Sequence, residues 1–486
     1  MFIFMKGLKM KRTNILFAIA DDASHMSAYG HNFLSTPAFD RVAKEGILFT
    51  RAFTTNPKCA PSRASILTGR HTWQLEEACL HWNNFPKNWS VFPETLEDAG
   101  YHVGLTGKGW APGDWESFEW EHNPAGKEYS SISLDAPEGT CITSCDYTAN
   151  FVDFLDKKDD DQPFCFWYGC REPHRPYTFG EGVASGKDIS DADVPEYYPD
   201  NDDVRTDLMD YAREVEWFDM HLGNMLKILE ERGELDNTLV IVTSDNGMPF
   251  PRVKGQMYDD DFRLPLAVRW GDGCCGGRVV DDFISFRDFA PTICKVAGIE
   301  VPKTMTGRDF MNVLKSREDG VVDSTRDHIL MGRERHDMGR EGDLGYPVRC
   351  LRNDQWLYVW NCAPDRWPSG NPETGYTDID SSPTKDAVLS AKENGDDKYW
   401  QLCMAKRPEH ELFDIKKDPH CVNNLAFKEE NKELVNDLHK QLIVELREQG
   451  DPRLDDPNYF EGKRYVGGAP HSWANYMDGS WEKQGY

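Results

Sequence analysis

The stretch NILFAIADD, residues 14–22, decides the fold. A short, nearly continuous apolar run that stops at two aspartates predicts a strand buried on both faces of a sheet. Four similar runs follow along the chain, separated by helical patterns. This alternation predicts an α/β fold, a mostly parallel sheet sandwiched by helices. The four runs cover residues 102–106, 164–168, 238–243 and 264–270.

The clearest helix is expected to begin at Asn201 or Asp202 and to end at Gly233, because apolar residues recur at steps of three and four. After about residue 315 the pattern changes. Alternating segments at 347–352, 355–361 and 411–415 predict antiparallel strands, and 428–448 predicts a closing helix. Segment 363–394, rich in Pro, Ser, Gly and Asp, is expected to be a long loop. The expected domains are an N-terminal α/β domain (1–315), a smaller C-terminal α+β domain with an antiparallel sheet (316–450) and an irregular, aromatic-rich tail (451–486).

The chain of 486 residues carries 55 Lys plus Arg against 83 Asp plus Glu, a formal net charge of −28. This excess argues against nucleic acids and anionic membranes as partners, because binding polyanions needs a basic surface. No apolar run approaches the roughly 18 residues of a membrane-spanning helix. The basic N-terminal segment and its short apolar run end at Asp21 and Asp22 instead of a cleavage site, and the 13 cysteines lack a disulfide framework. Both features favour a cytoplasmic location over a periplasmic or secreted one.

Polar side chains follow directly after four of the predicted strands. Because the carboxyl ends of parallel strands meet at one edge of a sheet, these side chains should converge on one site. Three carboxylates and one amide carbonyl among them form a hard-oxygen set that suits Ca²⁺ or Mg²⁺ and not Zn²⁺. The oxygen ligands are Asp21, Asp22, Asp245 and Asn246, and the other residues at this edge are Lys108 and His174.

A second motif is TNPKCAPSRASILTGR, residues 55–70. Pro61 suits the first turn of a helix and Gly69 suits its end, so Cys59 is expected at the helix N-terminus. The helix dipole and two neighbouring cations, Lys58 and Arg63, would stabilise negative charge on the thiol. The motif therefore predicts a reactive cysteine instead of an inert, packed one.

The segments CAPSR (59–63) and LTGR (67–70) together resemble the signature of the formylglycine-dependent (type I) sulfatases of the alkaline phosphatase superfamily. The segments GK (107–108), SDNG (244–247), 254–265, DFAPT (288–292) and ELFD (411–414) resemble further blocks of that family and stand in its order. The resemblance extends from about residue 14 to about residue 426. Within the family, 244–251 and 411–426 resemble the heparan N-sulfatases (sulfamidases) and their bacterial relatives. The implied fold is alkaline-phosphatase-like, with the catalytic site in the N-terminal domain.

The resemblance implies that a formylglycine-generating or radical maturation enzyme oxidises Cys59 to Cα-formylglycine. One hydroxyl of the hydrated aldehyde, bound to Ca²⁺, would attack sulfur, and the other would then release sulfate. The implied metal ligands are Asp21, Asp22, the modified Cys59, Asp245 and Asn246. The implied catalytic residues are Arg63, which polarises the hydrate, Lys108 and Lys254, which bind sulfate oxygens, and His174, the general acid.

The sequence departs from the family at Trp110, where a histidine that hydrogen-bonds the formylglycine is common. Either His71 or a water takes over that contact, or turnover is altered. Trp110 is alternatively expected to form part of a sugar-stacking wall, because its face is flat and apolar. Segment 332–337 suggests substrate binding in the second domain, with a solvated charge run as the alternative. Its candidate residues are Arg333, Arg335 and His336.

These features predict a sulfatase that removes an O-sulfate or an N-sulfate from a carbohydrate. A small positive pocket in an acidic body suits one sulfate at a time, so exo action on mono- or oligosaccharides is expected. One alternative is a phosphate or phosphonate monoester hydrolase of the same superfamily. A second is a catalytically silent protein that binds sulfated glycans, if Cys59 stays unmodified. The chain is expected to be a monomer or a homodimer.

Overall fold

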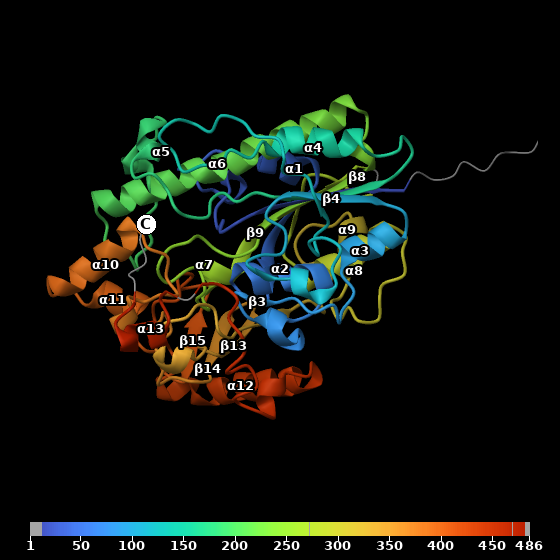
Figure 1. Cartoon of the computed structure of the whole chain (residues 1–486). Helices are drawn as coiled ribbons and strands as arrows, with labels where there is room; N and C mark the ends of the chain where they lie inside the picture. The colour runs from blue at the N-terminus through green and yellow to red at the C-terminus, as the bar shows by residue number, and fades with distance from the viewer. Residues whose placement is uncertain (1–11, 272, 469, 482–486) are drawn as a thin grey trace, which may run out of the picture.

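A computed structural model of the chain describes residues 12–271, 273–468 and 470–481 (Figure 1). In this part of the chain the largest sheet has nine strands, in the order β10-β2-β9-β8-β1-β7-β4-β6, with β11 paired to β2. The sheet is mostly parallel, as predicted. The strands are β1 (Asn14–Ala20), β2 (Ile47–Phe53), β4 (His102–Gly107), β6 (Lys127–Glu128), β7 (Phe164–Gly169), β8 (Thr238–Ser244), β9 (Arg263–Trp270), β10 (Arg278–Val280) and β11 (Ile284–Ser285).

Strand β1 occupies the middle of this sheet and pairs in parallel with both β7 and β8. Its side chains alternate between two apolar layers: Leu16 and Ala18 face one layer, and Ile15, Phe17 and Ile19 face the other. Both layers are fully buried along β1, which explains why this strand is a continuous apolar run. The departure from a parallel sheet is β9, which runs antiparallel to both β8 and β2.

Helices cover both faces of the sheet, and Figure 1 shows the two groups on opposite sides. Each group contributes apolar side chains to one of the two layers, so the sheet is sandwiched as predicted. One group is α1 (Pro37–Glu45), α4 (Tyr147–Asp156) and α6 (Asp202–Glu231); the other is α2 (Cys59–Thr68), α3 (Phe92–Asp98), α8 (Phe289–Val296) and α9 (Met311–Lys315). Helix α6 begins at its Asn201 N-cap and ends before Gly233, which confirms the predicted long helix.

A second sheet lies after the predicted boundary at residue 315, and in the described residues it has four antiparallel strands in chain order. They are β12 (His328–Arg333), β13 (Val348–Asn353), β14 (Trp356–Asn361) and β15 (His410–Asp414). Helix α12 (Lys432–Glu448) packs Leu438 and Leu442 onto one face of this sheet. The other face packs against Phe53 and Phe262 of the N-terminal part, so the two sheets share a core.

The predicted long loop at 363–394 is wrong for its last third. Helix α10 (Pro383–Glu393) begins there with Pro383 in its first turn, and the Ser382 side chain accepts a hydrogen bond from the Lys385 amide at the N-cap. These are ordinary helix-start features. Helices α11 (Lys398–Cys403) and α13 (Trp473–Asp478) are also present, the latter within the predicted irregular tail. No helix in the described ranges is long and apolar enough to cross a membrane.

Candidate active site

The ends of β1 and β8 bring Asp21, Asp22, Asp245 and Asn246 together, as the sheet topology predicts. Carboxylate oxygens of the three aspartates lie within 4.8 Å of one another, and all three side chains are buried. The Asn246 Nδ2 donates a hydrogen bond to Asp22 Oδ1 at 2.7 Å. Its own Oδ1 is buried and accepts no hydrogen bond from any described residue. Three carboxylates beside an unsatisfied amide oxygen can hold a metal ion, which would give that oxygen a partner.

The pKa shifts of Asp21 and Asp245 are also consistent with a cation at this position. Burial would raise the pKa of Asp21, but the charges of Lys108 and Arg63 outweigh it and hold that pKa well below its usual range. Burial raises the pKa of Asp245 to about 7, although Arg63 opposes the shift. The protein's own cations therefore do not compensate all three carboxylates, and a bound cation would favour the ionised form of Asp245.

Cys59 is the first residue of α2, as predicted, and only 1% of its surface is exposed. Its Sγ lies 3.4 Å from Asp21 Oδ1 and 3.8 Å from Asp22 Oδ1. Burial and the charge of Asp21 raise the pKa of the thiol well above its usual value. The predicted stabilisation of a thiolate by neighbouring cations is therefore wrong for the unmodified side chain, because burial and the carboxylates of Asp21, Asp245 and Asp22 outweigh the one opposing cation, Lys108. Lys58 pairs with Asp337 at 2.8 Å.

Arg63, one turn further along α2, links the two acidic strand ends. Its Nε donates to Asp245 Oδ2 at 2.8 Å and its Nη2 lies 3.4 Å from Asp21 Oδ1. Its Nη1 donates to the carbonyl oxygens of Lys108 and Gly109, so it also fixes the loop after β4. The guanidinium is fully buried, and these four acceptors engage all three of its nitrogen atoms.

Three further predicted catalytic residues surround the same aspartates. Lys108 Nζ lies 2.5 Å from Asp21 Oδ2, and Lys254 Nζ lies 2.6 Å from Asp22 Oδ2. His174 Nδ1 donates to the carbonyl oxygen of Arg175 at 2.6 Å, which directs Nε2 towards Asp22 Oδ2 at 3.9 Å. The side chain of His174 is 37% exposed, so its ring forms the border between the buried cluster and solvent.

Asp380 joins this cluster, although its sequence neighbourhood gave no signal. Its Oδ2 lies 2.9 Å from Lys254 Nζ, and it belongs to the connection between β14 and α10. Burial would raise the pKa of Asp380, but Lys254 and Lys58 outweigh it and lower that pKa, so the carboxyl group is ionised at neutral pH.

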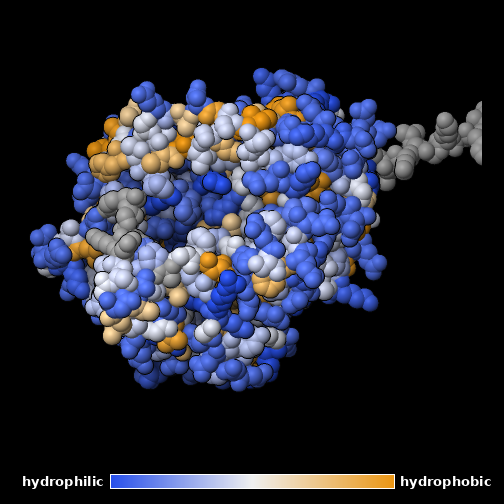
Figure 2. Space-filling view, in the orientation of Figure 1, coloured by the Kyte–Doolittle hydropathy of each residue, from blue (hydrophilic) through white to orange (hydrophobic). Residues whose placement is uncertain are grey.

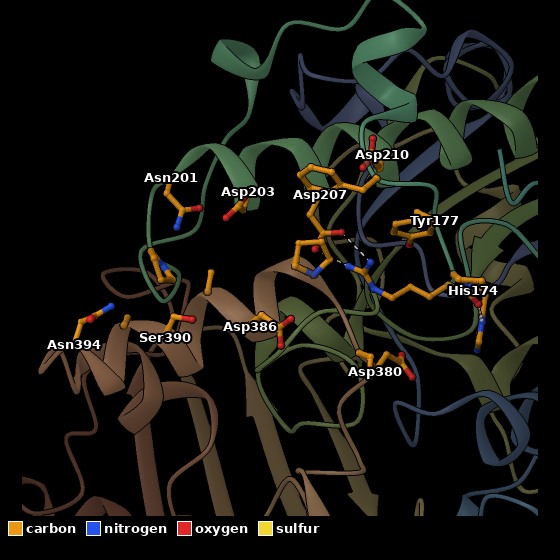
Figure 3. Close-up of a pocket in the computed structure, with 18 of the residues that line it drawn as sticks. His174, Tyr177, Asn201, Asp203, Asp207, Asp210, Asp380, Asp386, Ser390 and Asn394 are labelled. Carbon is orange, nitrogen blue, oxygen red and sulfur yellow. Dashed lines mark hydrogen bonds and ion pairs between the residues drawn. The ribbon is translucent and has the colours of Figure 1, made fainter. Parts of the chain in front are cut away.

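A cavity of about 910 Å³ opens beside His174 and Asp380. Figure 3 shows its walls: side chains from α6 lie on one side, and side chains from α10 lie on the other. Figure 2 shows the hollow on this face of the molecule, surrounded by mostly hydrophilic residues. His174 and Asp380 stand in its wall, so the cavity adjoins the acidic and basic cluster, and a second cavity of about 300 Å³, lined by Asp21 and Lys108, shares His174 with it. Its labelled residues in Figure 3 are His174, Tyr177, Asn201, Asp203, Asp207, Asp210, Asp380, Asp386, Ser390 and Asn394.

The predicted substrate residues of the second domain do not line this cavity as described, so their predicted role is wrong. Arg333 is 1% exposed and binds Asp378 at 2.9 Å. Arg335 donates to backbone carbonyl oxygens of the C-terminal tail, and the Nε2 of the fully buried His336 lies 2.9 Å from Asn56 Oδ1. All three side chains are internal structural groups, so the alternative of a solvated charge run is wrong as well.

Trp110 is also buried, with no exposed surface, so the sugar-stacking prediction is wrong. Its ring packs edge-on against Phe85 with centroids 4.9 Å apart, and its Nε1 donates to the carbonyl oxygen of Ala60 at 3.0 Å. Trp110 therefore supports the start of α2 from inside. His71 stacks on Trp73, and in the described part of the chain no recorded contact joins its ring to Cys59.

Comparisons with known proteins agree with this geometry. A family model described as Sulfatase matches residues 13–299, more than half of the chain. The chain is 29% identical over 495 residues to the human N-sulphoglucosamine sulphohydrolase, covering 92% of both chains. It is 26% identical over 495 residues to an ulvan-active sulfatase of Formosa agariphila, covering 91% of this chain and 76% of the relative.

A solved structure shares the fold. The structure of BT4656 in complex with its substrate D-glucosamine-2-N,6-O-disulfate aligns with a TM-score of 0.66 at 22% identity, covering 92% of this chain and 100% of that chain. The family match covers more than half of the chain, and the strand order and the convergence of acidic and basic residues at the strand ends agree with it. The chain belongs to the sulfatase family.

Proposed function

We propose that this sulfatase removes one sulfate from a small carbohydrate, with sulfated glucosamine, N- or O-sulfated, as its substrate class. The observation that carries the proposal is the similarity to the human N-sulphoglucosamine sulphohydrolase over 92% of both chains, together with the cavity that adjoins the cluster around Asp21 and Asp22 at His174 and Asp380. A cavity of about 910 Å³ has the size of a small-molecule site. An acidic pocket, lined by Asp203, Asp207, Asp210, Asp380 and Asp386, suits a terminal sugar better than the interior of a sulfated polymer.

Two groups complete the proposed site. Asp21, Asp22, Asp245 and Asn246 would hold Ca²⁺, which would supply positive charge and Lewis acidity. Cα-formylglycine, formed from Cys59 by a maturation enzyme, would supply the nucleophilic hydroxyl.

The chain's own residues would do the rest. Lys108 and Lys254 would bind the sulfate oxygens, because their ammonium groups already lie at the edge of the acidic cluster. His174 would donate a proton from Nε2 to the leaving oxygen or nitrogen, since its Nδ1 proton is committed to a backbone carbonyl oxygen. Arg63 would hold the two strand ends in place for these contacts.

A substrate panel tests the function. Protein produced with a maturation enzyme should hydrolyse at least one of N-sulfoglucosamine, glucosamine 6-O-sulfate and N-acetylglucosamine 6-O-sulfate. We expect its kcat/KM to exceed that on aryl phosphate and phosphonate esters by at least about 100-fold, because the site discriminates by transition-state binding. A higher kcat/KM on phosphate or phosphonate would contradict the proposal, as would sulfate release only from internal sites of polymers. Mass spectrometry of the peptide containing Cys59 separates an unconverted, silent binding protein from an active enzyme.

Removing the metal is expected to abolish activity, and adding Ca²⁺ should restore it. The more specific expectation concerns Asn246→Ala, which deletes the unsatisfied buried oxygen of the cluster. We expect this variant to bind Ca²⁺ about 10- to 100-fold more weakly in isothermal titration calorimetry, because one ligand is lost. The exposed Asn458→Ala serves as the control and should bind Ca²⁺ like the wild type. Equal Ca²⁺ affinity in both variants would exclude Asn246 as a ligand.

A further inference from the structure

Asp380 lies at the junction between the sulfate-binding lysine and the cavity. Its Oδ2 contacts Lys254 Nζ at 2.9 Å, and its side chain is 29% exposed towards the cavity that it lines. The same ammonium group contacts Asp22 Oδ2 at 2.6 Å. One positive charge is thus shared between two carboxylates, so negative charge remains on the cavity side of Lys254.

The remainder of the cavity wall adds to this negative charge. Asp386, in the first turn of α10, and Asp203 of α6 also line it, on the two sides seen in Figure 3. Among the described lining residues the single arginine, Arg175, is bound by Asp207 through two contacts of 2.8 Å, and none is a lysine. A second anionic group of a bound sugar would therefore meet carboxylates and no uncommitted guanidinium or ammonium group of these residues.

We propose that Asp380 is a specificity-determining residue that selects sugars with a single sulfate. It accepts a hydrogen bond from a hydroxyl or ammonium group on the sugar beside the sulfate that is removed, and it repels a second sulfate at that place. This inference rests on the proposed function, since it takes the cavity to be the sugar site. The physical reason is general. A carboxylate attracts hydrogen-bond donors such as hydroxyl and ammonium groups, and it repels a second sulfate, which carries a charge of the same sign.

Binding measurements test this without turnover. In a Cys59→Ala background with Ca²⁺ present, calorimetry compares N-sulfoglucosamine and glucosamine 6-O-sulfate with glucosamine 2-N,6-O-disulfate. We expect the disulfate to bind at least about tenfold more weakly than the better monosulfate. Asp380→Asn, which keeps the shape and removes the charge, should bring this ratio close to one, mainly by tightening disulfate binding. Asp380→Glu, which keeps the charge, should retain discrimination.

Asp365→Asn is the matched control, because Asp365 is an exposed aspartate in the same connection between β14 and α10 and does not line the described cavity. It should keep the wild-type ratio. The inference is overturned if the disulfate binds as well as the monosulfates, if neither monosulfate binds, or if Asp380→Asn leaves the ratio unchanged. Failure of the proposed function would give a different result: the converted wild-type protein would release no sulfate from any sugar, whatever the ratio of the binding affinities.

Discussion

Cys59→Ala is expected to abolish sulfate release. The side chain of Cys59 lies at the start of α2 with its Sγ 3.4 Å from Asp21 Oδ1. Lys108 contacts Asp21, and Lys254 contacts the neighbouring Asp22. Alanine leaves the sulfate-binding and metal-binding side chains in place and removes the thiol that the maturation enzyme oxidises, so no aldehyde hydrate and no nucleophilic hydroxyl group can form at residue 59. Loss of a covalent nucleophile lowers kcat by about 10⁴- to 10⁶-fold in comparable hydrolases. Ion chromatography of released sulfate, with the best sugar of the panel, measures the loss.

Cys294→Ala provides the matched control for this variant. Cys294 is also a fully buried cysteine in a helix, α8, but it packs in the apolar layer on one face of the sheet. Its replacement removes one sulfur atom and should change kcat by no more than a few fold. If Cys59→Ala kept more than about one hundredth of the wild-type kcat, covalent catalysis by residue 59 would be excluded.

Much of the central sheet could be predicted because burial on both faces makes its strands continuous apolar runs. Strands β1 and β8 begin where the sequence predicts. Strand β2 is not predicted, because Thr50 and Arg51 interrupt its apolar run. The guanidinium of Arg51 lies 5.2 Å from the centre of the Phe283 ring, so the aliphatic part of this side chain packs against apolar surface within the strand. The composition of 363–394 predicts a loop throughout, but Ser382 and Pro383 start a helix within it.

The site could be predicted where strand topology alone brings residues together. The residues after β1, β4 and β8 share one edge of the sheet, so their convergence follows from parallel pairing. Asp380 could not be found in this way. It is separated from Lys254 by 126 positions in the sequence, and it lies in an irregular connection and not at the end of a strand. The predictions for Trp110 and Arg333 were wrong for a related reason: tertiary packing decides whether an aromatic or basic side chain is exposed.

Arg349→Ala is expected to destabilise the protein strongly, because Arg349 belongs to a buried ion-pair network outside the active site. Arg349 of β13 is 1% exposed, and its Nε contacts Asp451 Oδ2 at 2.6 Å while its Nη2 contacts Glu334 Oε1 at 2.8 Å. Arg453 pairs with the same Glu334, so two guanidinium groups balance two carboxylates inside the protein. Alanine would leave one buried carboxylate uncompensated, at a cost of about 3–5 kcal/mol.

Urea unfolding, followed by tryptophan fluorescence, should report this cost as a lower midpoint for Arg349→Ala. The urea midpoint of Arg349→Lys should lie between those of Arg349→Ala and the wild type, because lysine keeps the charge but cannot make the forked contacts to two carboxylates. Arg317→Ala is the control: this exposed arginine has no ion pair with any described residue, and its loss should change stability by less than about 0.5 kcal/mol. If Arg349→Ala unfolded at the same urea concentration as Arg317→Ala, the buried network would contribute nothing to stability. In that case the contact between β13 and the C-terminal tail would have to rest on apolar packing alone, as in the cluster that includes Leu351 and Phe460.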